Sequence, residues 1–138
     1  MEKNNKFVII TPSYNNEEWV EPNLASMLNQ TYTNWRTIYI NDCSTDNTLE
    51  KVNSIVKNDK RFTIISNKKN QGATYNYINF LDQIDDNEII IHLDGDDWLI
   101  NEVVLEKLNQ YYNDNDVWMT YGGFVCWDGN ETKVGYPQ

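Results

Sequence analysis

Short segments rich in β-branched and aromatic residues recur along the chain and alternate with segments of helical spacing. The first kind occupies residues 7–10, 35–40, 62–65, 88–93 and 117–121. Segments of this length and composition are typical of strands, and several of them lack polar positions, as strands buried on both faces do. A further short strand is expected within residues 129–138.

Apolar residues in the intervening segments recur at intervals of three or four, which predicts amphipathic helices. The residues that share a helical face are Leu24, Met27 and Leu28; Leu49, Val52 and Val56; Ala73, Tyr77, Phe80 and Leu81; and Val104, Leu105 and Leu108. Ser44 or Thr45 is expected to cap the second helix, and Asn70 or Gln71 to open the third. Strand and helix alternate four times, so the predicted fold class is α/β, a mostly parallel central sheet with helices on both faces.

Three polar clusters follow predicted strands directly. They are T-P-S-Y-N-N-E at 11–17, N-D-C-S-T-D at 41–46 and D-G-D-D at 94–97. In open parallel sheets, ligands bind at the carboxyl ends of the strands. We therefore expect the three clusters to face one crevice.

The third cluster gathers three carboxylates in a chain that is already acidic. Asp94 and Asp96 are one residue apart, so an extended or turn segment presents both to one ligand. Mg2+ and Mn2+ prefer oxygen ligands of this kind and keep substrate phosphates in the remaining positions. The plainer alternative is a turn in which Asp97 stabilises the positive end of the following helix. An EF-hand loop is excluded, because Leu105 stands where a bidentate Glu is required.

The other two clusters contain residues suited to a nucleotide. Asp42 ends the second predicted strand, where a carboxylate can accept the N3–H of uracil or contact a ribose; a capping turn built by residues 44–46 is the alternative. Tyr14 follows the first strand, and its ring can stack on a base in a pocket lined by Thr11 and Pro12, unless it is simply a buried loop residue.

The remaining aromatic residues and the only histidine are assigned as follows. His92 has no His or Cys partner spaced for zinc, so a structural role is expected. Trp98 is a candidate platform for an acceptor sugar ring or a core residue. The other four tryptophans are expected to pack: Trp19, Trp35, Trp118 and Trp127.

Composition narrows the function classes. The 138 residues suit one domain, and the formal net charge of −10 argues against binding nucleic acid or an anionic membrane surface. No apolar run approaches a membrane span, and the first residues lack a signal-peptide core, so a cytoplasmic location is expected. Cys43 and Cys126 are expected to be free thiols in a reducing compartment. There is no G-x-G-x-x-G, Walker A or G-x-S-x-G motif.

With these residues in view, the sequence resembles the family 2 glycosyltransferases, which have the Rossmann-like GT-A fold with three α/β/α layers. The similarity covers nearly the whole chain. It is carried by P-S-Y-N at 12–15, S-M-L-N-Q-T-Y at 26–32, N-D-C-S-T-D-N-T at 41–48, N-Q-G at 70–72 and L-D-G-D-D-W-L at 93–99. The motifs occur in the order and at the spacing of the family.

The resemblance implies a role for several residues. Asp42 matches the aspartate that binds the nucleobase, typically uracil, and Pro12 and Tyr14 match the loop around the base. Asp96 of the D-x-D motif would contact Mn2+ or Mg2+ directly, and Asp94 would lie nearer the ribose or a metal-bound water. Asp97 matches a further acid that often follows. The sequence departs from the family at Asn41, where the family has the first acid of a D-D pair.

The function implied is a metal-dependent, inverting glycosyltransferase that takes a nucleotide-diphosphate sugar, typically a UDP-sugar, and an acceptor of unknown class. The alternatives are a donor-binding module without turnover, a nucleotidyltransferase of similar fold and a structural domain without a ligand.

The resemblance also carries an expectation about the general base. Family members normally continue into an acceptor-binding region that carries this group, well downstream of the D-x-D motif. Residues 1–138 are therefore expected to be a single donor-binding domain, truncated before that region, with the general base beyond Gln138. No carboxylate after Asp97 resembles that base, although Asp128 and Glu131 are present.

Overall fold

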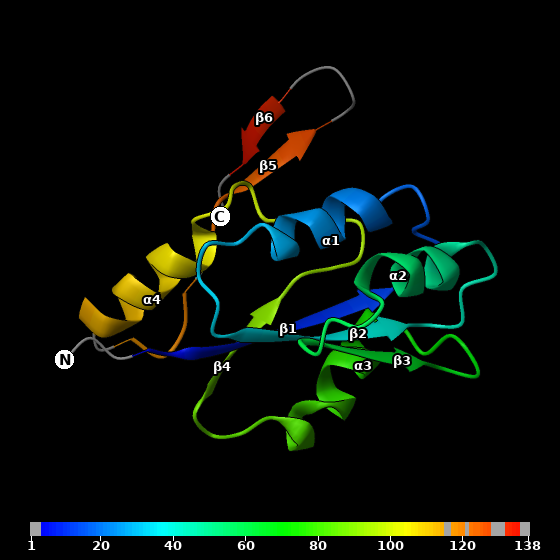
Figure 1. Cartoon of the computed structure of the whole chain (residues 1–138), viewed down its shortest axis with the longest axis horizontal. Coiled ribbons are helices and arrows are strands. Elements are labelled where there is room, and N and C mark those ends of the chain that lie inside the picture. The colour runs from blue at the N-terminus through cyan, green and yellow to red at the C-terminus, as the bar shows by residue number, and fades with distance from the viewer. Residues whose placement is uncertain (1–3, 115–116, 121, 128–131, 136–138) are drawn as a thin grey trace.

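A computed structural model describes residues 4–114, 117–120, 122–127 and 132–135. Four parallel strands form the central sheet: β1 (Lys6–Ser13), β2 (Trp35–Asn41), β3 (Phe62–Ser66) and β4 (Glu88–His92). Their order across the sheet is β3-β2-β1-β4, so β1 and β2 occupy the centre (Figure 1). The first four strands predicted from the sequence are therefore confirmed.

Helices cover both faces of this sheet, which confirms the three-layer α/β/α architecture. In Figure 1, α1 (Val20–Leu28) and α2 (Thr48–Val56) lie above the sheet and α3 (Ala73–Asn79) lies below it. A 3-10 turn, η1 (Leu81–Gln83), follows α3, and α4 (Val104–Asp114) follows β4.

Alternate residues of β1 supply the two cores, because successive strand side chains point to opposite faces. Phe7 and Ile9 pack with residues of α1, α2 and α4, whereas Val8 and Ile10 pack with Phe80 beside α3. All four of these β1 side chains are fully buried. The continuous apolar run of the first strand therefore reflects burial on both faces.

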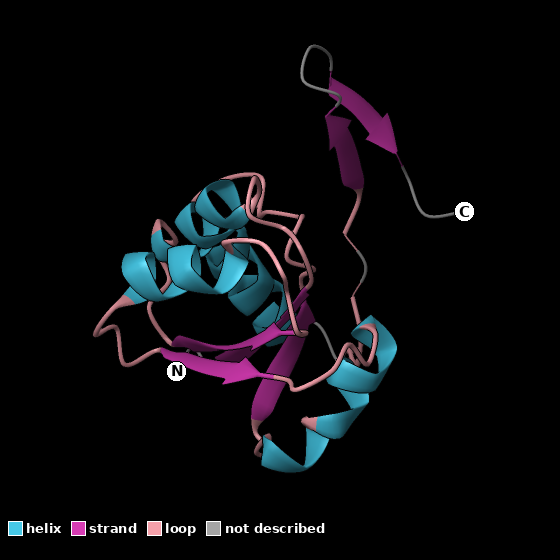
Figure 2. Cartoon of the chain, turned by 90° about the vertical axis from the view of Figure 1, so that its right-hand side faces the viewer, coloured by secondary structure: helices cyan, strands magenta, loops and turns pink. Residues whose placement is uncertain are grey.

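The strand expected at 117–121 is wrong for residues 117–120, which are irregular, and residue 121 lies outside the described residues. The next strand is β5 (Phe124–Trp127), which pairs antiparallel with β6 (Thr132–Gly135); β6 confirms the short strand expected near the C-terminus. Figure 2 shows this hairpin standing apart from the four-stranded sheet. Trp118 is 97% exposed, so its expected packing role is also wrong.

Two local predictions about helix starts are wrong as well. Helix α2 begins at Thr48 after Asn47, and Ser44 and Thr45 lie upstream of it in the loop. Helix α3 begins at Ala73 after Gly72, whose φ of 84° suits glycine, whereas Asn70 and Gln71 precede that residue. In both cases the helix begins later than the spacing of apolar residues suggested, so the polar residues expected at its start belong to the preceding loop.

Other expectations are met in the described part of the chain. Both cysteines are free. Trp35 is buried and its ring meets Phe62 edge to face. None of the described helices has the length and apolar character required to cross a membrane.

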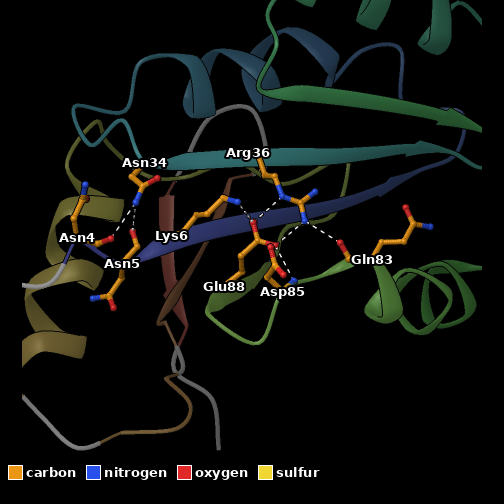
Figure 3. Close-up of polar contacts among 8 residues, drawn as sticks. All are labelled: Asn4, Asn5, Lys6, Asn34, Arg36, Gln83, Asp85 and Glu88. Atoms are coloured by element: carbon orange, nitrogen blue, oxygen red, sulfur yellow. Dashed lines mark hydrogen bonds and ion pairs between the residues drawn. The ribbon is translucent and has the colours of Figure 1, made fainter.

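An ion-pair network joins the amino ends of β1, β2 and β4 (Figure 3). Glu88 of β4 accepts hydrogen bonds from Arg36 of β2 at both oxygens, each 2.7 Å long, and lies 3.0 Å from Lys6 Nζ of β1. The Glu88 side chain is only 1% exposed. Hydrogen bonding to Arg36, opposed by burial and assisted by Lys6, lowers the pKa of Glu88 to about 2.

Replacing Glu88 by Gln should therefore destabilise the fold near neutral pH. We expect Glu88→Gln to lower the free energy of unfolding at pH 7 by about 1.5–3 kcal/mol, the value of hydrogen bonds to a charged group. Because the folded-state pKa is depressed, this stabilisation exists above the unfolded-state pKa of about 4.3 and disappears as the pH falls toward 2.

Denaturant unfolding of both proteins at several pH values checks this expectation. Glu18→Gln, at an exposed glutamate, is the matched control and should change little. A difference between wild type and Glu88→Gln that stays constant from pH 7 to pH 2 would contradict the assignment.

Candidate functional site

The first polar cluster, residues 11–17, lies at the carboxyl end of β1. The other two clusters are hydrogen-bonded to this strand end, one on each side. Asp42 N donates a hydrogen bond of 2.8 Å to Ser13 O, and Gly95 N donates one of 2.9 Å to Pro12 O. These bonds prolong the pairing of β1 with β2 and with β4 beyond the last regular residues. The expected convergence of residues 11–17, 41–46 and 94–97 is therefore confirmed.

Gly95 allows the D-G-D-D turn to lie directly against β1. A Cβ atom at this position would lie 2.5 Å from Ser13 Cβ and 2.9 Å from Asn16 Nδ2, and it would also clash with Ser13 Oγ. Only glycine fits this distance without movement of the neighbouring loop. The residue between Asp94 and Asp96 thus fixes how closely the acidic turn approaches the first cluster.

The first and second clusters are joined by hydrogen bonds between side chains and backbone. Asn15 N donates to Ser44 Oγ (3.0 Å), Thr45 N donates to Asn15 Oδ1 (2.8 Å) and Asn16 N donates to Thr48 Oγ1 (2.9 Å). Asn15 and Cys43 both have positive φ, 52° and 64°. Residues 44 and 45, expected to cap α2, instead hold the loop after β1.

Asp42 is almost completely buried, with 2% of its surface exposed. Its carboxylate accepts hydrogen bonds from Gly72 N (2.7 Å), Asn67 Nδ2 (2.8 Å) and Gln71 N (3.0 Å). Burial alone would raise the pKa of Asp42, but these hydrogen bonds outweigh it and hold the pKa below its usual value. Asp42 is therefore an ionised group that anchors the segment leading into α3.

Asp94 is held at its backbone and at one carboxylate oxygen. Its carbonyl accepts a hydrogen bond from Asn23 Nδ2 (3.1 Å), which also donates to Asp97 O (2.7 Å). Its Oδ1 accepts a hydrogen bond of 2.8 Å from the hydroxyl of Tyr77 on α3. Burial, followed by the bond to Asp94 and the nearby acidic charges, raises the pKa of Tyr77, so its hydroxyl remains a donor.

Sequence reasoning missed Asn23 and assigned Tyr77 only to the apolar face of a helix. The available signal for Asn23 was an amide beside Leu24 on the buried face of α1, where it has no exposed surface. Buried polar side chains are normally hydrogen-bonded, so such an amide indicates a specific partner. The identity of that partner depends on tertiary structure, because Asp94 lies 71 residues away.

Asp96 and Asp97 are exposed and complete the acidic turn. Although Asp97 is exposed overall, partial burial of its carboxyl group, followed by the charges of Asp96 and Asp94, raises its pKa. In the described ranges, none of the ion pairs involves these three carboxylates, and no group of three or more His, Cys, Asp or Glu side chains is arranged to hold a metal by itself. The three carboxylates are therefore acidic groups without a cationic side-chain partner among the ion pairs of the described residues.

The aromatic candidates lie around this region. Pro12 is buried, and Tyr14 is 46% exposed, which excludes the alternative of a buried loop tyrosine. Trp98 stacks on Trp19 with ring centroids 5.9 Å apart, and Trp127 of β5 meets both rings edge to face. Trp19 thus packs as expected, whereas Trp127 meets both rings but stays 50% exposed, so its expected packing is only partial; Trp98 is 37% exposed.

The general base is not assigned to a residue of this site. Its expected position beyond Gln138 stays a prediction, because the structure describes no residue after Gly135. Asp128 and Glu131, the two acidic residues noted after the D-x-D motif, also lie outside the described residues. No residue of the described site is given the role of the base.

Comparison with known proteins gives consistent results. The family model described as glycosyl transferase family 2 matches residues 8–138. A glycosyltransferase of Haemophilus influenzae is 34% identical over 128 residues, which are 91% of this chain and 50% of that protein. The UDP-Glc:alpha-D-GlcNAc-diphosphoundecaprenol beta-1,3-glucosyltransferase WfgD of Escherichia coli is 32% identical over 123 residues, 88% of this chain and 47% of that protein.

A solved structure supports the same relationship. S. aureus TarS 1–349 in complex with UDP-GlcNAc superposes with a TM-score of 0.71 and 27% identity, covering 79% of this chain and 31% of that chain. The chain therefore spans at most half the length of these relatives. On the match of its family model over nearly all of its length, the chain belongs to glycosyltransferase family 2.

Proposed function

We propose that this chain binds the donor of a glycosyltransferase, a UDP-sugar, between Asp42 and the D-G-D-D turn, for inverting transfer to an acceptor hydroxyl. One observation carries the proposal: hydrogen bonds to Pro12 and Ser13 place the two acidic groups on either side of the same strand end. UDP itself has a nucleoside, made of a flat base with polar edges and a ribose, and a charged diphosphate. The two sides of the strand end suit these two parts.

The nucleoside is assigned to the side of Asp42. Its ionised carboxylate is an acceptor suited to the N3–H of uracil, and exposed Tyr14 and buried Pro12 belong to the cluster whose backbone is bonded to Asp42 N. The same carboxylate already accepts backbone N–H groups from residues 71 and 72. Asp42 would then both shape this wall of the site and read the base.

The diphosphate is assigned to the acidic turn, where it needs a cation. Asp96 and Asp94, with Asp97 beside them, would hold Mn2+ or Mg2+, which neutralises charge on the departing diphosphate. Inversion requires the acceptor oxygen to attack the anomeric carbon on the side opposite the leaving UDP. The attacking hydroxyl gives its proton to a general base, a contribution typically worth about 10²–10⁴-fold in rate.

UDP binding should depend on a divalent cation, because the acidic turn repels a diphosphate. Asp96→Ala should weaken Mn2+-supported UDP binding by at least about tenfold, since even the outer partners of metal ligands are worth about 10–100-fold in metal affinity. Calorimetry with Mn2+ and with a chelator measures both effects.

Asp86→Ala is the matched control for charge, because Asp86 is an exposed carboxylate just before β4, at the opposite end of that strand. It should bind UDP as wild type does. Equal UDP affinity with Mn2+ and with chelator would refute the proposed cation site.

The role of Asp42 in reading the base predicts a difference between two ligands. Asp42→Asn should weaken UDP by about 1.5–3 kcal/mol, the value of a hydrogen bond to a charged group. Metal-bound pyrophosphate, which has no base, should bind almost as it does to wild type. Calorimetric titration of both ligands gives the comparison.

Asp46→Asn controls for disruption of the loop, because Asp46 also accepts backbone N–H bonds there, from Glu17 and Thr48. It should not distinguish UDP from pyrophosphate. If Asp42→Asn weakened both ligands equally, Asp42 would shape the segment before α3 without reading the base.

A further inference from the structure

Tyr77 lies on α3 with its hydroxyl directed at the acidic turn. The hydroxyl donates to Asp94 Oδ1 at 2.8 Å. The tyrosine ring stacks on the His92 ring, with centroids 4.2 Å apart and planes 21° from parallel. It also packs against the buried cluster formed by Val8, Ile10, Ile38, Ile40 and Phe80. A ring held on several sides fixes the position of its hydroxyl.

Asp94 therefore has little freedom to rearrange around a cation. Its carbonyl is bonded to buried Asn23 of α1, and its Oδ1 is bonded to Tyr77 of α3. These two helices lie on opposite faces of the sheet (Figure 1). Donation from Tyr77 weakens Oδ1 as a ligand, so Oδ2 is the better placed oxygen of Asp94 for a cation or a cation-bound water.

We infer that Tyr77 is a positioning residue that biases Asp94 toward coordination through Oδ2 alone and thereby favours a small octahedral cation over Ca2+. The inference rests on the proposed function of the acidic turn. Mg2+ requires near-ideal octahedral geometry at about 2.0–2.1 Å, whereas Ca2+ takes 6–8 oxygen ligands and readily accepts both oxygens of one carboxylate. A carboxylate whose second oxygen is weakened as a ligand disfavours the two-oxygen binding that Ca2+ accepts and leaves the octahedral arrangement intact.

Tyr77→Phe isolates this contribution, because it removes the hydroxyl and keeps the ring with its packing. Asp94 is only half-buried, so water can replace the lost donor and the fold should persist. Tyr75→Phe is the matched control: the residue lies on the same helix, two positions away, and is 48% exposed. Thermal unfolding of both variants verifies that they are folded.

The measurement is UDP affinity by calorimetry with Mn2+, Mg2+ or Ca2+ for wild type, Tyr77→Phe, Tyr75→Phe and Asp96→Ala. Wild type should bind UDP more tightly with Mn2+ than with Ca2+. Tyr77→Phe should lower the ratio of Mn2+-supported to Ca2+-supported affinity by about tenfold, at the lower end of the range for outer partners of metal ligands. Tyr75→Phe should leave the ratio unchanged.

The outcomes for the different variants distinguish failure of the inference about Tyr77 from failure of the proposed cation site. If Asp96→Ala abolishes metal dependence but Tyr77→Phe keeps the wild-type ratio, the cation site stands and the role of Tyr77 is refuted. A uniform loss of affinity with all three cations also refutes it, because a merely structural role would not discriminate between cations. If wild type shows no metal dependence, the cation site and the inference both fail.

Discussion

The backbone hydrogen bonds at Pro12 and Ser13 determine the geometry of everything that surrounds the site. They are made by the carbonyls of a strand whose side chains are buried on both faces, so the strand cannot shift without exposing Phe7 to Ile10. One carbonyl receives Gly95 N and the next receives Asp42 N. The separation of the two acidic groups is thus set by the pairing distance of parallel strands, and flexible loops contribute little to it.

Helix α3 forms a second connection between the same two groups. The backbone N–H of Gly72, just before the helix, donates to Asp42, and the Tyr77 hydroxyl one turn into the helix donates to Asp94. A displacement of α3 would therefore alter both acidic groups together. Such an arrangement favours a site that is largely formed before a ligand arrives, which reduces the ordering cost of binding.

The sequence was sufficient for the features that depend on local pattern and on chain topology. The apolar runs identified the parallel strands, and their carboxyl ends identified the three polar clusters. The contacts of Asn23 and Tyr77 with Asp94 were not predictable from the sequence. Each residue lies on a helix distant from Asp94 in the sequence, and the apolar pattern of that helix indicates only that one face is buried. The strand expected at 117–121 failed over residues 117–120 for a similar reason: an apolar run shows that burial would be favourable, but Trp118 is 97% exposed.

The two ends of the sheet treat negative charge in opposite ways. At the amino ends, Glu88 is neutralised by Arg36 and Lys6, and its pKa falls to about 2, which stabilises the folded state. At the carboxyl ends, partial burial and the charges of Asp96 and Asp94 raise the pKa of Asp97. Among the described residues these acids form no ion pair, so their repulsion opposes folding. Any cation that binds the folded chain there removes this repulsion, and its binding free energy adds to stability. The carboxyl ends of the strands are thus less stable in the absence of a ligand, and binding of the proposed cation would stabilise them.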